Sequence, residues 1–457
     1  MKSIKPLSLI FIIISLLGYI FLYYGIDRTE FFSLIISVFI LGLIYFYWLK
    51  NKSLTVKMIL VIGVLFRVVL LFDTPNFSDD FYRFAWDGKL QTQGINPYLQ
   101  TPTQLVAENT DFKVEETHDL YLNLNSKEYF TVYPPVNQSF FALAELASNG
   151  SIYQTVIWMK VIILLFEIGL FYILFLILKR LKLPETLSQI YFLNPLVIIE
   201  LTGNVHFEGV MLFFLMLGLL MVLRNKIWLT GIALGLAVSV KLIPLLILPL
   251  FLPLLGWKKS TKLYVALGIT FILTLLPFIT TELIDNFSQS VNLYFQTFEF
   301  NASVYYLLKE ISYITIGYKS SLLGMLIPLF VFCFAMYLVI KLYKESKVGE
   351  VPFKLFIQKA AVLLFIYYML ATTVHPWYVI NLVVLSVFLN SRVYLLWSLT
   401  VFLSYFAYSS YILNFAPDQD FHQYNWYYFI IALEYLALVF FVIFERRKSN
   451  QNLKINL

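Results

Sequence analysis

The sequence has 457 residues, of which 60% are hydrophobic and 13% are charged. A soluble domain usually has about 45 to 50% apolar and about 25% charged residues, so this composition excludes a soluble protein. The formal net charge of +6 does not indicate nucleic-acid binding, because the Lys and Arg residues lie in short clusters between long apolar runs. The single cysteine, Cys333, excludes an intramolecular disulfide and a metal site built from cysteines.

Long apolar runs predict an all-α polytopic membrane protein with about twelve transmembrane helices, since a helix needs roughly 20 residues to cross a bilayer. The N-terminal run has no pattern for signal-peptide cleavage, so we predict that it is retained as the first helix. The first run ends at Tyr24, and the others cover residues 30–49, 54–73, 152–178, 185–202, 207–223, 262–280, 321–341, 355–373, 376–391, 393–412 and 425–444.

Basic clusters at alternate ends of these runs predict the topology of one integral membrane domain, residues 1–457. Cytoplasmic loops are enriched in Lys and Arg, so both termini and alternate loops are expected in the cytoplasm. Residues 74–151, 281–320 and 413–424 are then extracytoplasmic, and they hold most of the acidic residues. A connection as long as residues 74–151 usually has a function, so we expect the chemistry on the outer face.

Residues 228–255 form an apolar stretch with a basic residue at each end, Lys226 and Lys258. Because both ends are then cytoplasmic, we predict a re-entrant helical hairpin that turns near Lys241 and Pro244. A charge at membrane depth usually faces a partner or a watery cavity, so Lys241 is expected to meet an anion such as a phosphate. The alternative is a long bent helix from which Lys241 extends to a membrane surface.

Residues 77–89, FSDDFYRFAWDGK, predict a short amphipathic helix on the outer leaflet. Ser78 is a candidate N-cap, and Asp79 and Asp80 follow in the first turn, where carboxylates interact well with the helix dipole. Turn-forming residues in GINPY, residues 94–98, end the element. The two carboxylates could act as a base on a lipid-borne substrate, or they could only cap the helix.

Helical spacing places Arg83 and Asp87 on the side of the helix that carries the two aspartates, because residues three and four apart are neighbours. Both are therefore candidate substrate-binding residues. The aromatic residues of this segment are expected at the membrane interface. They are Phe77, Phe81, Tyr82 and Phe84.

Residues 78–88 read Ser-Asp-Asp-x-Tyr-Arg-x-x-Trp-Asp-Gly, and Gly-Ile-Asn-Pro-Tyr follows them. Together with the later Tyr133-Pro134-Pro135 and the arrangement of spans and loops, this pattern resembles the GT-C superfamily of polyprenyl-phosphate-sugar-dependent glycosyltransferases. Bacterial mannosyltransferases are the members that the chain resembles most. The resemblance covers residues 54 to about 380. It departs at the N-terminus, where two predicted spans precede the one that leads into the acidic loop.

The resemblance implies a multi-pass protein of the bacterial inner or plasma membrane. It implies that the protein transfers a hexose, with mannose as the expected sugar, from a polyprenyl-phosphate donor to a glycan or lipid acceptor, with inversion. Asp79 or Asp80 would be the base that takes the acceptor proton. The departing phosphate needs positive charge, for which Lys241, Arg83 and Arg67 are candidates. Arg67 could instead only pair with Asp73, or its side chain could extend outward to a membrane surface.

Other polar groups on the outer side could line the pocket. Tyr133 precedes two prolines and could face a sugar ring, with Asn137 and Gln138 as neutral hydrogen-bonding groups. It could equally be an ordinary aromatic residue at the membrane interface.

Two predicted outer turns carry the histidines that concern the site. Asn204, His206 and Glu208 lie between glycines at one turn and are candidate substrate-binding residues, or only a polar connection between helices. His375 lies at another helix end, where aromatic residues are expected regardless of function, and is a candidate for contact with the lipid phosphate.

A divalent cation, Mg²⁺ or Mn²⁺, could be held by Asp79 and Asp80, but the same pair can act as a base without metal. Two other functions remain open: a transporter or flippase, and a polymerase or ligase of lipid-linked glycans. Transporters often contain inverted repeats, and no repeat is evident in this sequence.

Overall fold

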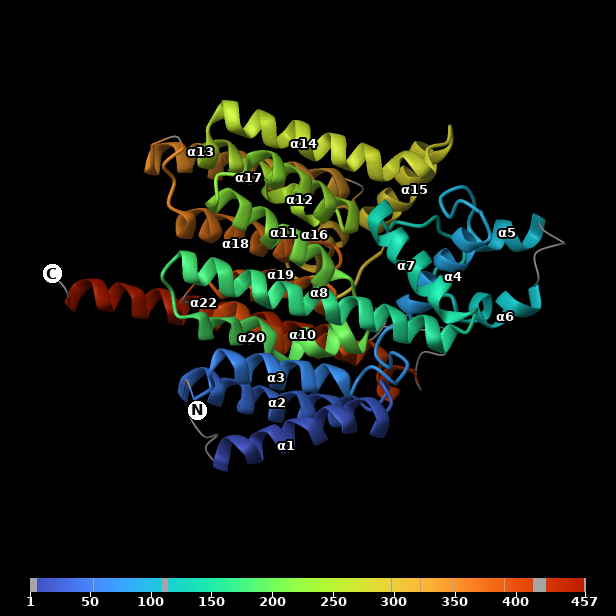
Figure 1. Cartoon of the computed structure of the whole chain (residues 1–457), viewed down its shortest axis with the longest axis horizontal. Coiled ribbons are helices and arrows are strands. Elements are labelled where there is room, and N and C mark those ends of the chain that lie inside the picture. Colours follow the sequence, from blue (N-terminus) through green and yellow to red (C-terminus); the bar gives the residue numbers. More distant parts are fainter. Residues whose placement is uncertain are drawn as a thin grey trace. The chain divides into compact units, whose positions relative to one another are not determined.

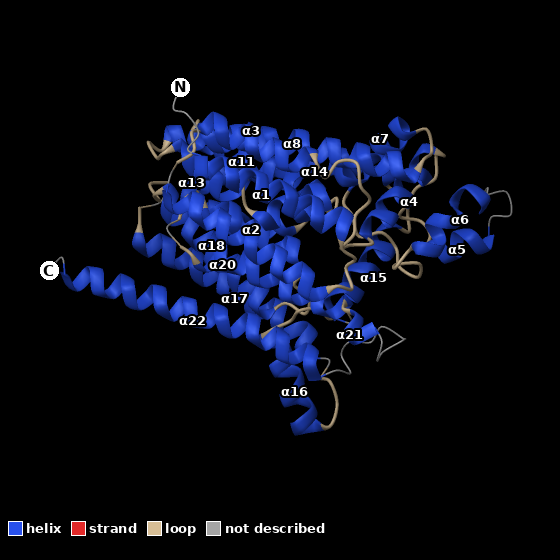
Figure 2. Cartoon of the chain, turned by 90° about the horizontal axis from the view of Figure 1, so that it is seen from below, coloured by secondary structure: helices blue, strands red, loops and turns tan. Residues whose placement is uncertain are grey.

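The computed structural model describes residues 6–51, 53–108, 114–296, 298–320, 322–347, 349–389, 391–413 and 425–455. The regular elements in these ranges are helices (Figure 1 and Figure 2), apart from one isolated backbone bridge between Phe300 and Thr373. The prediction of an all-α protein is therefore confirmed.

The helices form two compact units, and each is built from separated stretches of the chain. Unit 1 contains Met1–Phe66, Pro184–Ile198 and Phe298–Leu457, and unit 2 contains Arg67–Leu183 and Ile199–Thr297. Unit 2 therefore holds the whole of the predicted first outer loop.

Unit 1 packs α1 on α2, α17 on α18 and α20 on α22. The short helices η2, α9 and α10 lie in a segment that also contacts these helices. The Tyr45 hydroxyl donates to the Ile190 carbonyl oxygen at 2.7 Å, and the Asn194 amide donates to the Ser398 hydroxyl at 2.9 Å. The elements are α1 (Pro6–Ile20), η1 (Phe21–Gly25), α2 (Phe31–Asn51), α3 (Val56–Val68, which continues into unit 2), η2 (Glu185–Ser188), α9 (Gln189–Phe192), α10 (Pro195–Val197), α16 (Val304–Ile316), α17 (Leu322–Glu345), α18 (Phe353–Leu370), η6 (Pro376–Val379), α19 (Ile380–Ser386), α20 (Val393–Thr400), η7 (Val401–Tyr408), α21 (Ser410–Leu413) and α22 (Asn425–Ile455).

Unit 2 packs α8 against α7 and α11, and α12 against α11 and α14. Two glycines permit close helix contacts: a Cβ on Gly88 would lie 2.6 Å from the Phe141 carbonyl oxygen, and one on Gly231 would lie 2.4 Å from the Leu263 carbonyl oxygen. The elements are α4 (Asp80–Thr92), α5 (Pro102–Glu108), α6 (Val114–Asn123), α7 (Pro135–Ser148), α8 (Ile152–Arg180), η3 (Ile198–Gly203, which begins in unit 1), α11 (Glu208–Leu223), α12 (Ile227–Val240), η4 (Ile243–Leu250), α13 (Phe251–Leu255), α14 (Trp257–Leu275), η5 (Leu276–Phe278) and α15 (Leu283–Gln296).

Eight helices in the described ranges are long and apolar enough to cross a membrane. They correspond to eight of the predicted apolar runs, and many of their large apolar side chains are exposed, as on α17. The other four runs form shorter or broken helices; Pro195–Gly203, for example, meets Glu208–Leu223 at an angle of 115°. The structure thus supports a multi-pass membrane protein, and the count of twelve crossings stays a prediction. The eight are Pro6–Gly25, Phe31–Asn51, Ile152–Arg180, Trp257–Phe278, Leu322–Glu345, Phe353–Leu370, Val393–Ile412 and Asn425–Arg447.

The predicted hairpin at residues 228–255 has its helix break where the sequence indicated. α12 ends at Val240, and Lys241 has an extended backbone with φ −150° and ψ 143°. Pro244 lies in the first turn of η4, which follows. The path of this segment through a membrane stays a prediction.

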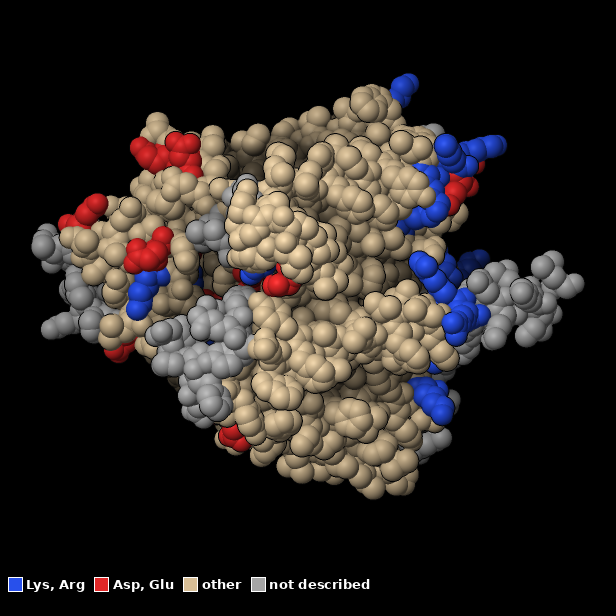
Figure 3. Space-filling view, turned by 180° about the vertical axis from the view of Figure 1, so that it is seen from behind, with Lys and Arg blue, Asp and Glu red and all other residues tan. Residues whose placement is uncertain are grey.

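Basic residues from three connections meet at one end of unit 2. Arg180, at the end of α8, donates to the Leu223 carbonyl oxygen at 2.7 Å, and the Lys259 ammonium donates to the Asn225 side chain at 3.0 Å. α8 has 29 residues, so this end lies about 44 Å from its other end, where α7 precedes it. On the face in Figure 3 most of the surface is uncharged, and the charged side chains gather mostly near its edges.

Candidate functional site

The two predicted catalytic carboxylates lie at the start of α4. Asp79 is the N-cap residue, and its side chain makes no capping hydrogen bond; the Ser78 hydroxyl accepts one from the Asp80 backbone N–H at 3.3 Å. The sequence predicts the cap at Ser78, so the helix begins one residue later than expected. Both aspartates are partly exposed, which leaves their carboxyl groups within reach of a substrate.

Three of the four aromatic residues predicted at the membrane interface are buried instead, and the fourth, Tyr82, is partly exposed. Phe77, Phe81 and Phe84 are buried within unit 2, and the ring of Phe84 stacks on that of Phe141 with centroids 4.7 Å apart. The prediction was wrong because α6 and α7 pack on α4. Protein therefore covers the apolar side of this helix.

The turn between η3 and α11 brings His206 next to Asp80. The ring is buried, with Nε2 3.8 Å from an Asp80 carboxylate oxygen and Nδ1 3.3 Å from a Glu200 carboxylate oxygen. Asn204 holds this turn in place, because its amide donates to Glu200 at 3.0 Å and its Oδ1 accepts from the Phe77 N–H at 3.4 Å. Two residues predicted for the site therefore contact the segment that carries the aspartates.

The surroundings of His206 favour its protonated form. Burial lowers the pKa of the ring because it removes hydration from the imidazolium, but the nearby Asp80 and Glu200 carboxylates outweigh burial and raise this pKa above its ordinary value. His206 lies in a turn outside the eight candidate spans. A protonated ring would stabilise the ionised form of Asp80, which is the form that a general base needs.

Glu208 and Lys241, both predicted to bind substrate, form an ion pair. Glu208 is the first residue of α11 and is almost fully buried, whereas the side chain of Lys241 at the end of α12 is 18% exposed. The sequence predicts an anion near Lys241, and the structure supplies a carboxylate from this chain. Part of the Lys241 side chain remains exposed beside this ion pair.

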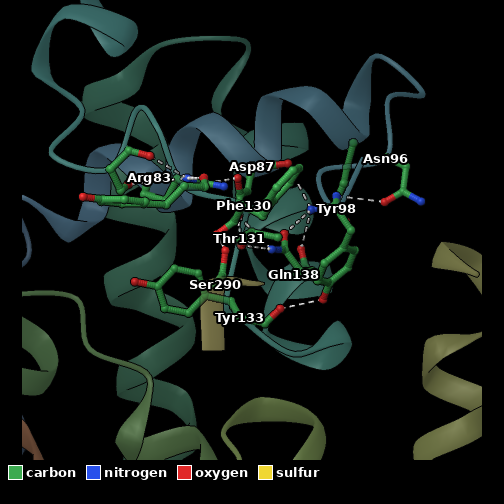
Figure 4. A network of polar contacts seen from close by, with 12 residues as sticks. Arg83, Asp87, Asn96, Tyr98, Phe130, Thr131, Tyr133, Gln138 and Ser290 are labelled. Carbon is green, nitrogen blue, oxygen red and sulfur yellow. Dashed lines mark hydrogen bonds and ion pairs between the residues drawn. The ribbon is translucent and has the colours of Figure 1, made fainter. Parts of the chain in front are cut away.

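Asp87 joins polar groups from α4, α7 and the segment between them (Figure 4). One carboxylate oxygen accepts from Arg83 Nε at 2.8 Å; the other accepts from the Thr131 hydroxyl at 2.6 Å and the Gln138 amide at 2.8 Å. All four residues are buried. The network fixes the loop that carries the site, and the predicted contact of Asp87 with substrate stays a prediction.

Arg83 has further partners in the same loop. Its guanidinium donates to the carbonyl oxygens of Ser126 at 3.1 Å and Tyr129 at 2.8 Å. The Tyr133 carbonyl oxygen accepts from the Tyr98 hydroxyl at 2.5 Å, and the Tyr133 ring packs edge-on against other aromatic rings. These contacts position the loop, and the structure leaves the predicted binding roles of Arg83 and Tyr133 untested.

Arg67 pairs with a carboxylate that the sequence analysis did not propose. Its guanidinium makes two hydrogen bonds of 2.8 Å to Glu167 on α8, and both side chains are fully buried. The alternative partner Asp73 was therefore the wrong choice. Thr202 adds a hydrogen bond of 3.1 Å to the same carboxylate.

Lys160 is also a buried cation, and it was not among the residues proposed from the sequence. Its ammonium, on α8, donates to the carbonyl oxygens of Leu70 at 2.7 Å and Asp73 at 2.6 Å, just beyond the end of α3. Lys160, Glu167 and Glu200 all lie within predicted apolar runs. An ionisable residue in such a run marks a site or a buried pair, and this signal could have identified all three.

His375 lies in unit 1, whereas the other predicted site residues lie in unit 2. Its ring stacks on Trp377, with centroids 4.3 Å apart, and on Phe300, with centroids 4.8 Å apart. The predicted contact of His375 with a lipid phosphate stays a prediction.

The metal prediction concerns Asp79 and Asp80. Over the described ranges, no group of three or more His, Cys, Asp or Glu side chains is placed to hold a metal ion. His206 lies 3.8 Å from Asp80, and its raised pKa favours a positive ring there. A divalent cation held by Asp79 and Asp80 stays a prediction.

Helices of membrane-spanning length, an acidic segment beside a buried histidine, and a partly exposed lysine in the same unit fit a membrane enzyme. Residues 20–256 match the profile of the family described as "Alpha-(1->6)-mannopyranosyltransferase, N-terminal domain". The match covers more than half of the chain, and the chain belongs to this family. The resemblance to mannosyltransferases that the sequence predicted is confirmed.

A curated protein of Corynebacterium glutamicum, "Alpha-(1->6)-mannopyranosyltransferase B", is similar to part of the chain. The two are 26% identical over 157 residues, which is 34% of this chain and 25% of the relative. The match thus spans about a quarter of the length of that protein.

Proposed function

We propose that the chain is an integral membrane glycosyltransferase. It transfers a hexose, mannose by its family, from a polyprenyl-phosphate donor to a glycan or lipid acceptor on the extracytoplasmic face, with inversion. The observation that carries the proposal is the position of Asp80: its carboxylate is partly exposed, next to the buried ring of His206 and in the same unit as Lys241.

The reaction needs a base on the acceptor side. The acceptor hydroxyl oxygen attacks the anomeric carbon from the face opposite the phosphate, and its proton passes to the carboxylate of Asp79 or Asp80. His206 does not take part in bond formation in this scheme. It positions Asp80 and keeps its carboxylate ionised, through the contact of 3.8 Å.

The bond between the anomeric carbon and the phosphate oxygen breaks, and the polyprenyl phosphate leaves with one more negative charge. Of the three cations predicted for this role, Lys241 has the most exposed side chain, at 18%, whereas Arg67 and Arg83 are buried. Lys241 is therefore the cation that stabilises the charge that develops on the leaving phosphate.

The position of the two aspartates along unit 2 supports an extracytoplasmic site. The Tyr153 hydroxyl at the start of α8 donates to the Phe72 carbonyl oxygen at 2.9 Å, which places the segment leading to α4 near that end of α8. The basic cluster around Arg180 is at the opposite end, about 44 Å away along the helix. Basic ends of spans favour the cytoplasm, so the aspartates belong on the other side.

Transfer of sugar from a synthetic polyprenyl-phosphate mannose by the purified full chain tests the proposal. We expect Asp79→Asn or Asp80→Asn, whichever removes the base, to lower kcat about 10²- to 10⁴-fold. Asp119→Asn, an exposed acidic position on α6, is the matched control and should keep full activity. Undiminished transfer by both site variants, or transport of the lipid without a new glycosidic bond, would refute the proposal.

A further inference from the structure

Asn137 and Glu208 of unit 2 both carry buried polar atoms that lack hydrogen-bond partners. Asn137, in the first turn of α7, is fully buried, and neither atom of its amide group has a partner. Glu208 uses one carboxylate oxygen for Lys241, and its other oxygen is buried without a partner. Buried polar groups are almost always hydrogen-bonded, so these two call for an explanation.

The two groups lie beside the same aromatic cluster. Phe207 packs its ring against Phe140 and Phe141 of α7, with centroids 6.1 Å and 5.3 Å apart. Asn137 is three and four residues before these phenylalanines, so it lies on the same face of α7, one turn nearer the N-terminus. Glu208 directly follows Phe207. The unpartnered groups therefore flank one contact between α7 and the start of α11.

The missing partners define the chemistry of a ligand. The amide of Asn137 offers a donor and an acceptor, and the free oxygen of Glu208 is an acceptor. A phosphate oxygen accepts hydrogen bonds and could satisfy only the amide donor. A hydroxyl group both donates and accepts, so neighbouring hydroxyls on one ring could satisfy all three.

We propose that Asn137 and Glu208 form a subsite that binds ring hydroxyls of the donor hexose. Glu208 links this subsite to the phosphate, because its other oxygen holds Lys241. A hexosyl phosphate carries hydroxyls and a phosphate on one pyranose ring, as this arrangement requires. The inference rests on the proposed function for the identity of the donor, and it adds Asn137 as a residue that determines specificity for the sugar.

Binding of the donor and its monodeoxy analogues tests the subsite without any need for turnover. Polyprenyl-phosphate mannose and analogues that each lack one ring hydroxyl carry the same charge, so differences in Kd report the hydroxyls. We expect one analogue to bind the wild-type chain about 10- to 100-fold more weakly than the parent donor. Asn137→Ala should weaken binding of the parent donor by a similar factor. The same variant should bind the analogue that lacks the recognised hydroxyl with the Kd that the wild type has for it.

Ser139→Ala is the matched control, because Ser139 is exposed on the same helix and its hydroxyl donates within α7 to the Pro135 carbonyl oxygen. It should leave every Kd unchanged. Asn137→Leu is a second variant that replaces the unpaired amide by an apolar group of similar size, and it should fold even if Asn137→Ala does not.

The results separate this inference from the proposed function. The subsite would be overturned if Asn137→Ala weakened binding of the parent donor and of every analogue by the same factor. It would also be overturned if the wild-type chain bound the parent and all analogues equally well. Both outcomes hold whether or not sugar is transferred. Binding with the expected pattern but without formation of a glycosidic bond would refute the transferase and leave the subsite standing.

Discussion

The guanidinium of Arg67 and the carboxylate of Glu167 form a fully buried ion pair with two hydrogen bonds of 2.8 Å. The pair joins the end of α3 to the middle of α8 within unit 2. A bidentate contact of this kind fixes both the distance and the angle between the two helices. Arg67 therefore serves the packing of unit 2, which holds α4 and its aspartates.

Glu167→Gln should destabilise the protein strongly, because it leaves the guanidinium buried without this negative charge. We expect the free energy of unfolding to fall by about 3–5 kcal/mol, whereas the double variant Arg67→Met/Glu167→Leu, which buries no charge, should lose less. Thermal unfolding of the detergent-solubilised chain measures both effects. If Arg67→Met instead raised the donor KM at an unchanged unfolding midpoint, Arg67 would bind substrate as the sequence analysis predicts.

Arg83→Lys should weaken the loop that follows α4. A lysine ammonium cannot match the fork that reaches both Asp87 and the carbonyl oxygens of Ser126 and Tyr129. We expect the free energy of unfolding to fall by about 1–3 kcal/mol. At temperatures below the lowered unfolding midpoint, the KM for the donor should be unchanged. Gln93→Ala, at an exposed position just past α4, is the control. A raised KM at an unchanged midpoint would contradict the positioning role.

The raised pKa of His206 predicts how stability depends on pH. Because the folded-state pKa lies above the unfolded value of about 6.5, protonation stabilises the fold fully below that pH, and the gain is lost as pH rises through the folded-state pKa. His206→Gln removes this contribution. The difference in unfolding midpoint between wild type and variant should be largest in acid and shrink as pH rises; a difference that grows with pH would show the opposite shift.

Labelling of single cysteines tests which side of the membrane holds the site. Cys333→Ala removes the exposed native thiol, and Gln93→Cys and Lys258→Cys then place one at each end of unit 2. In intact cells a membrane-impermeant maleimide should modify the thiol at position 93, and the thiol at position 258 only after permeabilisation. The reverse pattern would place the aspartates in the cytoplasm and exclude the proposed donor side.

The sequence allowed prediction of those features that depend on local patterns. Apolar runs predicted the long helices, and the pairing of Ser78 with acidic residues predicted the start of α4 to within one residue. The basic flanks and Pro244 placed the break after α12 next to Lys241. These features follow from hydrophobicity, helix capping and proline geometry, which are properties of neighbouring residues.

The partners of the charged residues could not be predicted in the same way. Glu208 and Lys241 lie on different helices and meet only because α11 packs on α12. Likewise, the period of the aromatic residues in α4 shows that one side is apolar, but not whether lipid or protein covers it. Phe77 and Phe81 are buried, and α6 and α7 pack on α4.

The interleaving of the two units has a consequence for how the protein is made. The chain leaves unit 1 after Phe66 and returns to it for the last time at Phe298, so a ribosome finishes unit 2 before unit 1. The early helix α2 must wait in the membrane for α20 and η7, two of its partners, which are made near the end of the chain. A truncated gene that ended at residue 256 would lack α14 and leave its contact face on α12 uncovered.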